Sequence, residues 1–259
     1  MDAAAFESDT YIKETMKRFK LVDMRGSYHE LIERAEHSGM GYREFLIQLL
    51  KSEEEGKKLR QEERLVRKAG FESIKELSDI DYRFNPSIDK GKIDALSELD
   101  FIKAHENVII IGPPGVGKSM IATGLGRKAC AAGYHVLFAN AKELVDTLYK
   151  EMQEGNLQKA LTAIQKIPLL IIDELSYLKM DREKESIFFQ IIRQRYEKGS
   201  LIITTNLPLG RWNEVFTGQL AATAILDRLV HHCHVLSITG DSYRVKGEKR
   251  KEYAKNEIP

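Results

Sequence analysis

The chain has 259 residues, enough for one α/β domain and a smaller helical appendage. With 42% hydrophobic and 31% charged residues, it is expected to form a soluble protein with a packed core. No apolar run approaches the roughly 20 residues of a membrane-spanning helix, so no membrane association is expected. The formal net charge of +1 gives no global electrostatic argument for nucleic-acid binding.

The N-terminus has no basic region followed by an apolar stretch, so we expect no secretory signal. The cysteines Cys130 and Cys233 show neither paired spacing nor a secreted context. We therefore expect reduced thiols in a cytoplasmic protein.

Residues 1–70 predict a small helical domain. Apolar side chains recur at helical spacing between Tyr28 and Leu50, and Gly39 and Gly41 interrupt them, which predicts a turn between two helices. Residues 51–68 continue as a polar helix whose charges allow i,i+4 pairs. We expect a second domain over residues 71–259.

The pattern changes near Pro86, which favours an extended residue before it, and Ser87 or Asp89 is expected to cap the next helix. Short apolar runs then alternate with helical patterns. The expected strands are Asn107–Ile111, His135–Ala139, Leu169–Ile172, Leu201–Thr205 and His234–Ile238. The expected helices are Ser119–Ala132, Ala141–Lys150, Glu183–Lys198 and Leu220–Val230. Strands that are apolar on both faces predict a buried parallel sheet in an α/β sandwich.

A glycine-rich segment, GPPGVGKS, follows the first of these strands and opens a helix. Such a loop points successive N–H groups at phosphate oxygens, and the helix N-terminus adds partial positive charge. The pattern predicts a site for ATP and Mg²⁺, with Lys118 on the β- and γ-phosphates and Ser119 on the metal. The residues expected to contact the nucleotide are Gly112, Pro113, Pro114, Gly115, Val116, Gly117, Lys118, Ser119 and Met120.

Two acids end the run LLIIDE. Their position places Asp173 at the carboxyl edge of the sheet, where it is expected to hold the magnesium shell. Glu174 beside it is expected to polarise the attacking water as a general base. Together the loop and the acids predict a magnesium-dependent ATPase.

Two further polar residues carry alternative interpretations. Asn206 follows a strand and either senses the γ-phosphate or orients water, or else it starts a turn. Arg228, at a helix end, either pairs with the helix dipole or reaches a neighbouring subunit's γ-phosphate. The residues alone leave both choices open.

The run His231-His232-Cys233-His234 contains metal-binding residue types. Adjacent residues entering a strand point to alternate faces, and structural zinc ligands are normally spaced by two or more residues. We therefore do not expect these four residues to form a zinc site.

Taken together, the motifs resemble AAA+ ATPases, and more narrowly the IstB-type transposition helper proteins of insertion sequences. The resemblance covers about residues 15–246. Besides the nucleotide motifs, it rests on Tyr42–Leu46, Asp100–Val108, Arg182-Glu183, Arg193–Gly199, Leu226–His232 and Gly240–Arg244. It implies an AAA+ P-loop sandwich with a central parallel sheet, an all-α N-terminal domain and no C-terminal helical lid.

The resemblance also implies a function: bacterial proteins of this type bind duplex DNA without sequence preference when ATP is present, oligomerise on it and regulate a partner transposase. Such a protein is cytoplasmic and associated with the nucleoid when bound to DNA. By the same resemblance Arg228 acts in trans on ATP at a subunit interface, and Arg244 has a sensor-like role. The chain departs from the family pattern at Ser176–Met180, where Lys179 replaces a common proline.

Two alternative functions stay open. Replicative helicase loaders of the DnaC type share the ATPase half, although some use clustered N-terminal cysteines and no cysteine precedes Cys130 here. A nucleotide-gated protein scaffold is the other. The run Lys57–Lys68, with six basic and two acidic residues, is either a solvated helix face or a clamp for DNA or a neighbouring subunit. The hypothesised clamp residues are Lys57, Lys58, Arg60, Arg64 and Arg67.

Overall fold

A computed structural model of the protein describes residues 3–175, 180–216 and 219–243. The chain divides into two compact units, Met1–Arg64 and Leu65–Pro259. Within the described residues, no helix combines the length and the apolar character needed to cross a membrane.

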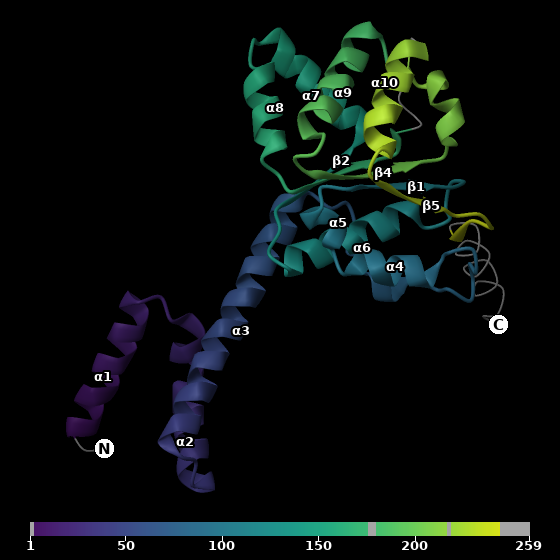
Figure 1. Cartoon of the computed structure of the whole chain (residues 1–259). Coiled ribbons are helices and arrows are strands. Elements are labelled where there is room, and N and C mark those ends of the chain that lie inside the picture. The colour runs from purple at the N-terminus through teal and green to yellow at the C-terminus, as the bar shows by residue number, and fades with distance from the viewer. Residues whose placement is uncertain (1–2, 176–179, 217–218, 244–259) are drawn as a thin grey trace, which may run out of the picture. The chain divides into compact units, whose positions relative to one another are not determined.

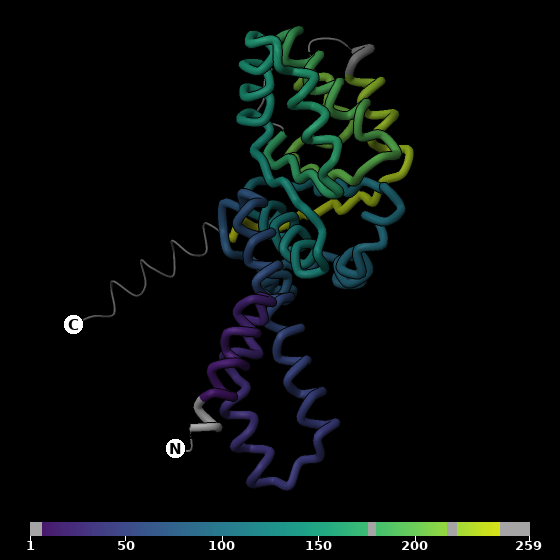
Figure 2. Tube along the Cα trace, turned by 90° about the vertical axis from the view of Figure 1, so that its left-hand side faces the viewer, coloured from purple at the N-terminus to yellow at the C-terminus, as the bar shows by residue number. Residues whose placement is uncertain are grey.

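The N-terminal unit is built from α1 (Ala3–Arg18), α2 (Val22–Ser38) and the first part of α3 (Tyr42–Ala69). Helices α2 and α3 form a hairpin (Figure 2) around a small core of Met24, Tyr28, Leu31 and Leu49. Gly39 ends α2 at a φ of 65°, a left-handed conformation that glycine adopts without strain. The predicted turn between two helices is thus confirmed.

The side chain of Glu53, on α3, joins α3 to the start of α2. Its buried carboxylate accepts hydrogen bonds from the backbone N–H groups of Asp23, at 2.8 Å, and Met24, at 3.1 Å, and so caps the start of α2. Arg60 pairs with Asp23 and, at 3.2 Å, with Glu53. Arg60 is therefore paired with acids of the same hairpin, although its side chain is 39% exposed. The other residues of the hypothesised clamp are exposed: Lys57, Lys58, Arg64 and Arg67.

The second unit contains a five-stranded parallel sheet, and all five predicted strands are confirmed to within one residue at each end. The strand order is β2-β3-β4-β1-β5. The strands are β1 (Asn107–Ile111), β2 (Val136–Asn140), β3 (Leu169–Asp173), β4 (Ser200–Thr205) and β5 (Cys233–Ser237). The α-helices are α4 (Lys90–Ser97), α5 (Asp100–Lys103), α6 (Lys118–Ala131), α7 (Ala141–Gln153), α8 (Leu157–Gln165), α9 (Arg182–Arg195) and α10 (Gln219–Val230). The described residues also include the 3-10 helices η1 (Leu77–Asp79) and η3 (Leu209–Glu214).

Helices cover both faces of the sheet, with α4 to α6 on one side and α7 to α10 on the other (Figure 1). Strand β1 shows why the strands are apolar throughout. Val108 and Ile110 pack into the core that contains Leu125 of α6, whereas Ile109 packs into the core that contains Phe188 of α9. A strand buried on both faces needs apolar residues at consecutive positions.

Three local features differ from or refine the sequence prediction. Helix α8 was not predicted, because its apolar residues Leu157, Leu161 and Ile164 span barely two turns. Asp89 caps α4 by accepting a hydrogen bond from the N–H of Lys92 at 3.1 Å. Ser87 instead donates to the carbonyl of Thr239 at 2.8 Å.

Arg195, the last residue of α9, is only 1% exposed. Its guanidinium donates to the carbonyls of Ile164, Ile167, Pro168 and Ser200 at 2.8–3.2 Å, and so ties α8 and the starts of β3 and β4 together. Burial lowers the pKa of Arg195 to about 10. Its buried Nε has no hydrogen-bond partner among the described residues, so the two Nη groups make all four of these bonds. A buried cation is stabilising only while such bonds are made.

Arg195→Ala should therefore lower the free energy of unfolding by about 3–5 kcal/mol, since it leaves buried carbonyls without donors. Arg193→Ala, an exposed position on the same helix, should change it by less than about 0.5 kcal/mol. Urea unfolding followed by circular dichroism measures both. Equal unfolding midpoints for the two variants would contradict this role for Arg195.

Candidate nucleotide-binding site

A cavity of about 420 Å³ lies at the carboxyl ends of β1, β3 and β4, the edge at which open parallel sheets bind ligands. This volume is in the range of small-molecule sites. The lining residues are Ser73, Lys75, Asp79, Pro114, Gly115, Gly117, Lys118, Ser119, Met120, Glu174, Thr205, Asn206 and Tyr243. The structure thus brings much of the predicted loop together with Glu174 and Asn206.

The glycine-rich loop connects β1 to α6. Gly115 and Gly117 have φ angles of 82° and 101°, which fold the loop over the N-terminus of α6. Lys118 is the first residue of that helix, and its ammonium donates to the carbonyl of Pro113 at 2.9 Å. Val116 is fully buried in the core.

Gly112 is the first residue of the loop, and its position has no room for a side chain. A Cβ atom at Gly112 would lie 2.3 Å from the carbonyl oxygen of Ile238, so this glycine allows the loop to approach the end of β5. Gly112, Pro113 and Val116 therefore shape the loop, and the other predicted loop residues line the cavity.

Asp173 ends β3 and is 3% exposed. Its carboxylate accepts a hydrogen bond from the Ser119 hydroxyl at 3.0 Å and another from the hydroxyl of Thr204 on β4. The Thr204 oxygen in turn accepts from the N–H of Glu174 at 2.9 Å. Thr204, which the sequence did not single out, thus positions both acids. A serine hydroxyl beside a carboxylate is an oxygen donor set suited to Mg²⁺.

Glu174 follows in a left-handed conformation, with a φ of 60°. Its carboxylate accepts a hydrogen bond from the side-chain amide of Asn140 at 3.3 Å. Asn140 ends β2, where it is in register with Asp173. Asn140 was not predicted as a site residue, although Asn140 and Asn206 share the pattern of an amide side chain at the end of a strand.

A third carboxyl group, that of Glu72, interacts electrostatically with Asp173 and Glu174. Burial raises the pKa of Glu72, and the charges of Asp173, Glu174 and Glu143 raise it further. The carboxylates around the Ser119–Asp173 pair therefore create a negative potential that a divalent cation would relieve.

Tyr243 closes the other side of the cavity. Its N–H donates to the carbonyl of Gly115 at 2.9 Å, and its hydroxyl donates to the carbonyl of Asp81 at 2.8 Å. Its ring lies 4.1 Å from that of Phe84. Burial raises the pKa of the Tyr243 hydroxyl, and the charge of Asp81 adds to the rise. This residue carried no separate prediction, because only the fold brings it to the loop.

Arg228 lies outside the cavity lining, on α10. Its guanidinium donates to the carbonyl of Ala224 at 2.8 Å and lies 5.1 Å from the ring centroid of Phe189. Arg244, the other cation assigned to the nucleotide, lies outside the described residues, as do Ser176–Lys179 of the departing loop.

The sequence profile of the family of IstB-like ATP binding proteins matches residues 14–251 of the chain. An ATP-binding protein of insertion sequence IS21 from Pseudomonas aeruginosa is 42% identical, over 91% of this chain and 89% of its own length. The corresponding protein of IS5376 from Geobacillus stearothermophilus is 37% identical, over 93% of this chain and 96% of its own.

Solved structures share the fold. The crystal structure of DnaI superposes with a TM-score of 0.53 at 21% identity, over 71% of this chain and 98% of that one. The replication initiator DnaA bound to AMPPCP and single-stranded DNA gives a TM-score of 0.50 at 16% identity, over 68% of this chain and 57% of that one. These similarities show that the chain shares the α/β fold of these proteins.

Thr204→Val keeps the side-chain shape but removes the hydroxyl between Asp173 and Glu174. Because hydrogen bonds to charged groups contribute about 1.5–3 kcal/mol, we expect the magnesium-dependent affinity for ATP to fall about tenfold or more. Thr204→Ser keeps the hydroxyl and should retain most of the affinity. Titration of a fluorescent ATP analogue with and without Mg²⁺ measures this difference. A Val variant that binds as tightly as the Ser variant would rule out the positioning role.

Proposed function

Since the chain belongs to the family of IstB-like ATP binding proteins, we propose that it is a magnesium-dependent ATPase that assembles on duplex DNA and recruits a transposase to it. The observation that carries the proposal is the convergence of Lys118, Ser119 and Glu174 at one cavity, with the buried Asp173 carboxylate hydrogen-bonded to Ser119. The relatives from insertion sequences supply the biological setting.

In the proposed reaction the loop N–H groups and Lys118 bind the phosphates of ATP. Ser119 and Asp173 would hold Mg²⁺, which would neutralise charge on the β- and γ-phosphates. Glu174 accepts a proton from the water that attacks the γ-phosphorus, and Asn206 orients that water. The bond from the γ-phosphorus to the β–γ bridging oxygen breaks, which gives ADP and phosphate.

The trans-acting residue in this proposal is Arg228. It lies on α10, outside the cavity of its own chain, and this supports a role on ATP held by a neighbouring subunit and not on its own. ATP would then bridge two subunits, and assembly would depend on the γ-phosphate. Arg244 is proposed as a second, sensor-like contact.

The proposed DNA contacts use the exposed cations of α3, since electrostatic contact with phosphates needs no sequence preference. Lys57, Lys58, Arg64 and Arg67 are the proposed residues, and Arg60 is excluded from this set by its internal ion pairs. In this proposal the protein works in the bacterial cytoplasm and joins the nucleoid when bound to DNA.

Glu174→Gln removes the proposed general base and keeps the size of the side chain. We expect ATP binding to be unchanged and the ATP-dependent assembly on duplex DNA to last longer, because hydrolysis is the release step. Dissociation from fluorescent duplex DNA after a challenge with unlabelled DNA measures the lifetime. Faster dissociation of the variant than of the parent would contradict the proposed order of events.

The exposed Glu154→Gln, at the end of α7, is a matched control and should behave as the parent.

The same assay at several salt concentrations separates DNA binding from a nucleotide-gated scaffold. Phosphate contacts lower log affinity by about 0.9 per neutralised phosphate per tenfold rise in salt. Affinity that does not vary with salt would favour the scaffold.

Arg228→Ala should reduce ATP turnover by about 10³–10⁵-fold, the usual contribution of an arginine finger, while nucleotide affinity is retained. A mixture with Lys118→Ala subunits tests the trans arrangement. In the mixture, an Arg228→Ala subunit binds ATP with its intact Lys118, and a neighbouring Lys118→Ala subunit contributes its intact Arg228. Such an interface has both residues, so mixing the two inactive variants should restore turnover. Unchanged turnover of Arg228→Ala alone, or no recovery on mixing, would remove the proposed role.

A further inference from the structure

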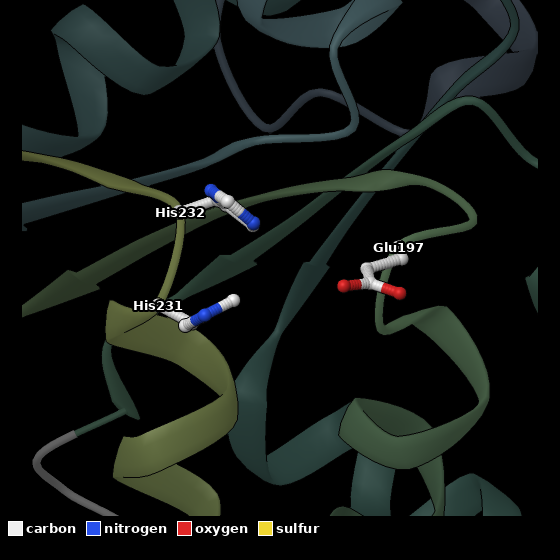
Figure 3. Close-up of side chains that lie close together, drawn as sticks. All are labelled: Glu197, His231 and His232. Atoms are coloured by element: carbon white, nitrogen blue, oxygen red, sulfur yellow. The ribbon is translucent and has the colours of Figure 1, made fainter.

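Three side chains from two separate turns lie together on the surface of the second unit (Figure 3). They are Glu197, in the turn after α9, and His231 and His232, in the turn between α10 and β5. Each offers one ligand atom, and these atoms lie within 4.8 Å of one another. We propose that Glu197, His231 and His232 form a binding site for a transition-metal dication of the Zn²⁺ type.

The histidine turn is held by a buried side chain. Asn107, at the start of β1, donates from its backbone N–H to the carbonyl of His232 at 2.8 Å and from its side-chain amide to the carbonyl of Leu229 at 3.1 Å. These two bonds fix the backbone on both sides of His231. The two imidazole rings lie 4.2 Å apart, centroid to centroid.

The glutamate turn is equally constrained. Glu197 has a φ of 57°, and the turn is closed by the N–H of Lys198, which donates to the carbonyl of Arg195 at 2.9 Å. Arg195 is itself fixed by its hydrogen bonds to four carbonyls. The carboxylate is therefore presented from a rigid segment, as a preorganised metal site requires.

Tyr196 supplies an outer contact. Its hydroxyl lies 3.1 Å from Nδ1 of His231. When Nδ1–H donates to this oxygen, Nε2 carries the free lone pair, which is how outer partners fix the tautomer of a metal-bound histidine. Tyr196 is thus a positioning residue of the proposed site.

The donor set indicates the class of metal. Two imidazoles and one carboxylate suit Zn²⁺, Ni²⁺ or Cu²⁺, whereas Mg²⁺ prefers oxygen ligands alone. Three protein ligands leave a coordination position for water. The next residues along the chain do not join the cluster: His234 pairs with Glu106 at 2.7 Å, and the Cys233 thiol contacts the carbonyl of His234.

The proposed site differs from a zinc site formed by four consecutive residues. Alternation of side chains applies to the strand, and β5 begins only at Cys233. His231 and His232 precede it in a turn, and the third proposed ligand, Glu197, lies 34 positions before His231 in the chain. The turns that carry the site precede β4 and β5, so it lies at the amino edge of the sheet, away from the nucleotide cavity at the carboxyl edge.

Metal binding by the full-length chain tests the proposal. The protein is stripped with a chelator, returned to a buffer with excess Mg²⁺ to saturate oxygen-ligand sites, and titrated with Zn²⁺ in a calorimeter. We expect one Zn²⁺ per chain. His231→Ala, His232→Ala and Glu197→Gln should each weaken this binding by tenfold or more. Tyr196→Phe should weaken it by about 10–100-fold, the usual effect of losing an outer contact.

His234→Ala is the matched control, since it removes a neighbouring histidine outside the cluster and should leave Zn²⁺ binding unchanged. Zn²⁺ should also raise the melting temperature of the parent but not of His231→Ala, because a metal that binds only the folded state stabilises it. The proposal is overturned if Zn²⁺ does not bind, if the three cluster variants bind like the parent, or if His234→Ala loses the site equally.

Discussion

The nucleotide site depends on the buried carboxylate of Asp173. A carboxylate that is 3% exposed must be hydrogen-bonded, and it accepts from Ser119 of the glycine-rich loop and Thr204 of β4. Thr204 also receives the N–H of Glu174. The Asp173 carboxylate therefore links the phosphate loop to β3, which carries Asp173, and to the neighbouring strand β4. The pairing of β3 with β4 sets the spacing between Asp173 and Thr204.

Residues close in sequence could be predicted, because their chemistry is local. The phosphate loop needs eight consecutive residues, and the acids need only a strand before them. Asn140 and Tyr243 could not be predicted in the same way, since Asn140 reaches Glu174 only because β2 pairs with β3, and Tyr243 reaches Gly115 only after β5. Strand order is determined by the packing of the whole domain, which apolar patterns do not specify.

The same distinction explains the cations. The helical pattern of α3 correctly predicted a charged helix, but it could not show that Arg60 faces Asp23 and Glu53 across the hairpin. Likewise, the two adjacent histidines acquire Glu197 as a neighbour only because β4 and β5 flank β1 and bring the preceding turns together. Local sequence identifies candidate groups, and the tertiary fold determines which of them meet.

The contacts of Arg228 affect the energetics of the proposed ATP-dependent assembly. In the single chain its guanidinium rests near the Phe189 ring and donates to its own helix. A cation–π contact at an exposed site contributes about 0.5–1 kcal/mol, and more when it is desolvated, as at the part-buried Arg228. An arginine finger lowers the barrier to phosphoryl transfer by roughly 4–7 kcal/mol, a gain made in the transition state and not in the ATP-bound ground state. In the proposed assembly, the ground-state contact of Arg228 with a neighbour's γ-phosphate would therefore have to offset the loss of the Phe189 contact, and the larger gain would follow in the transition state.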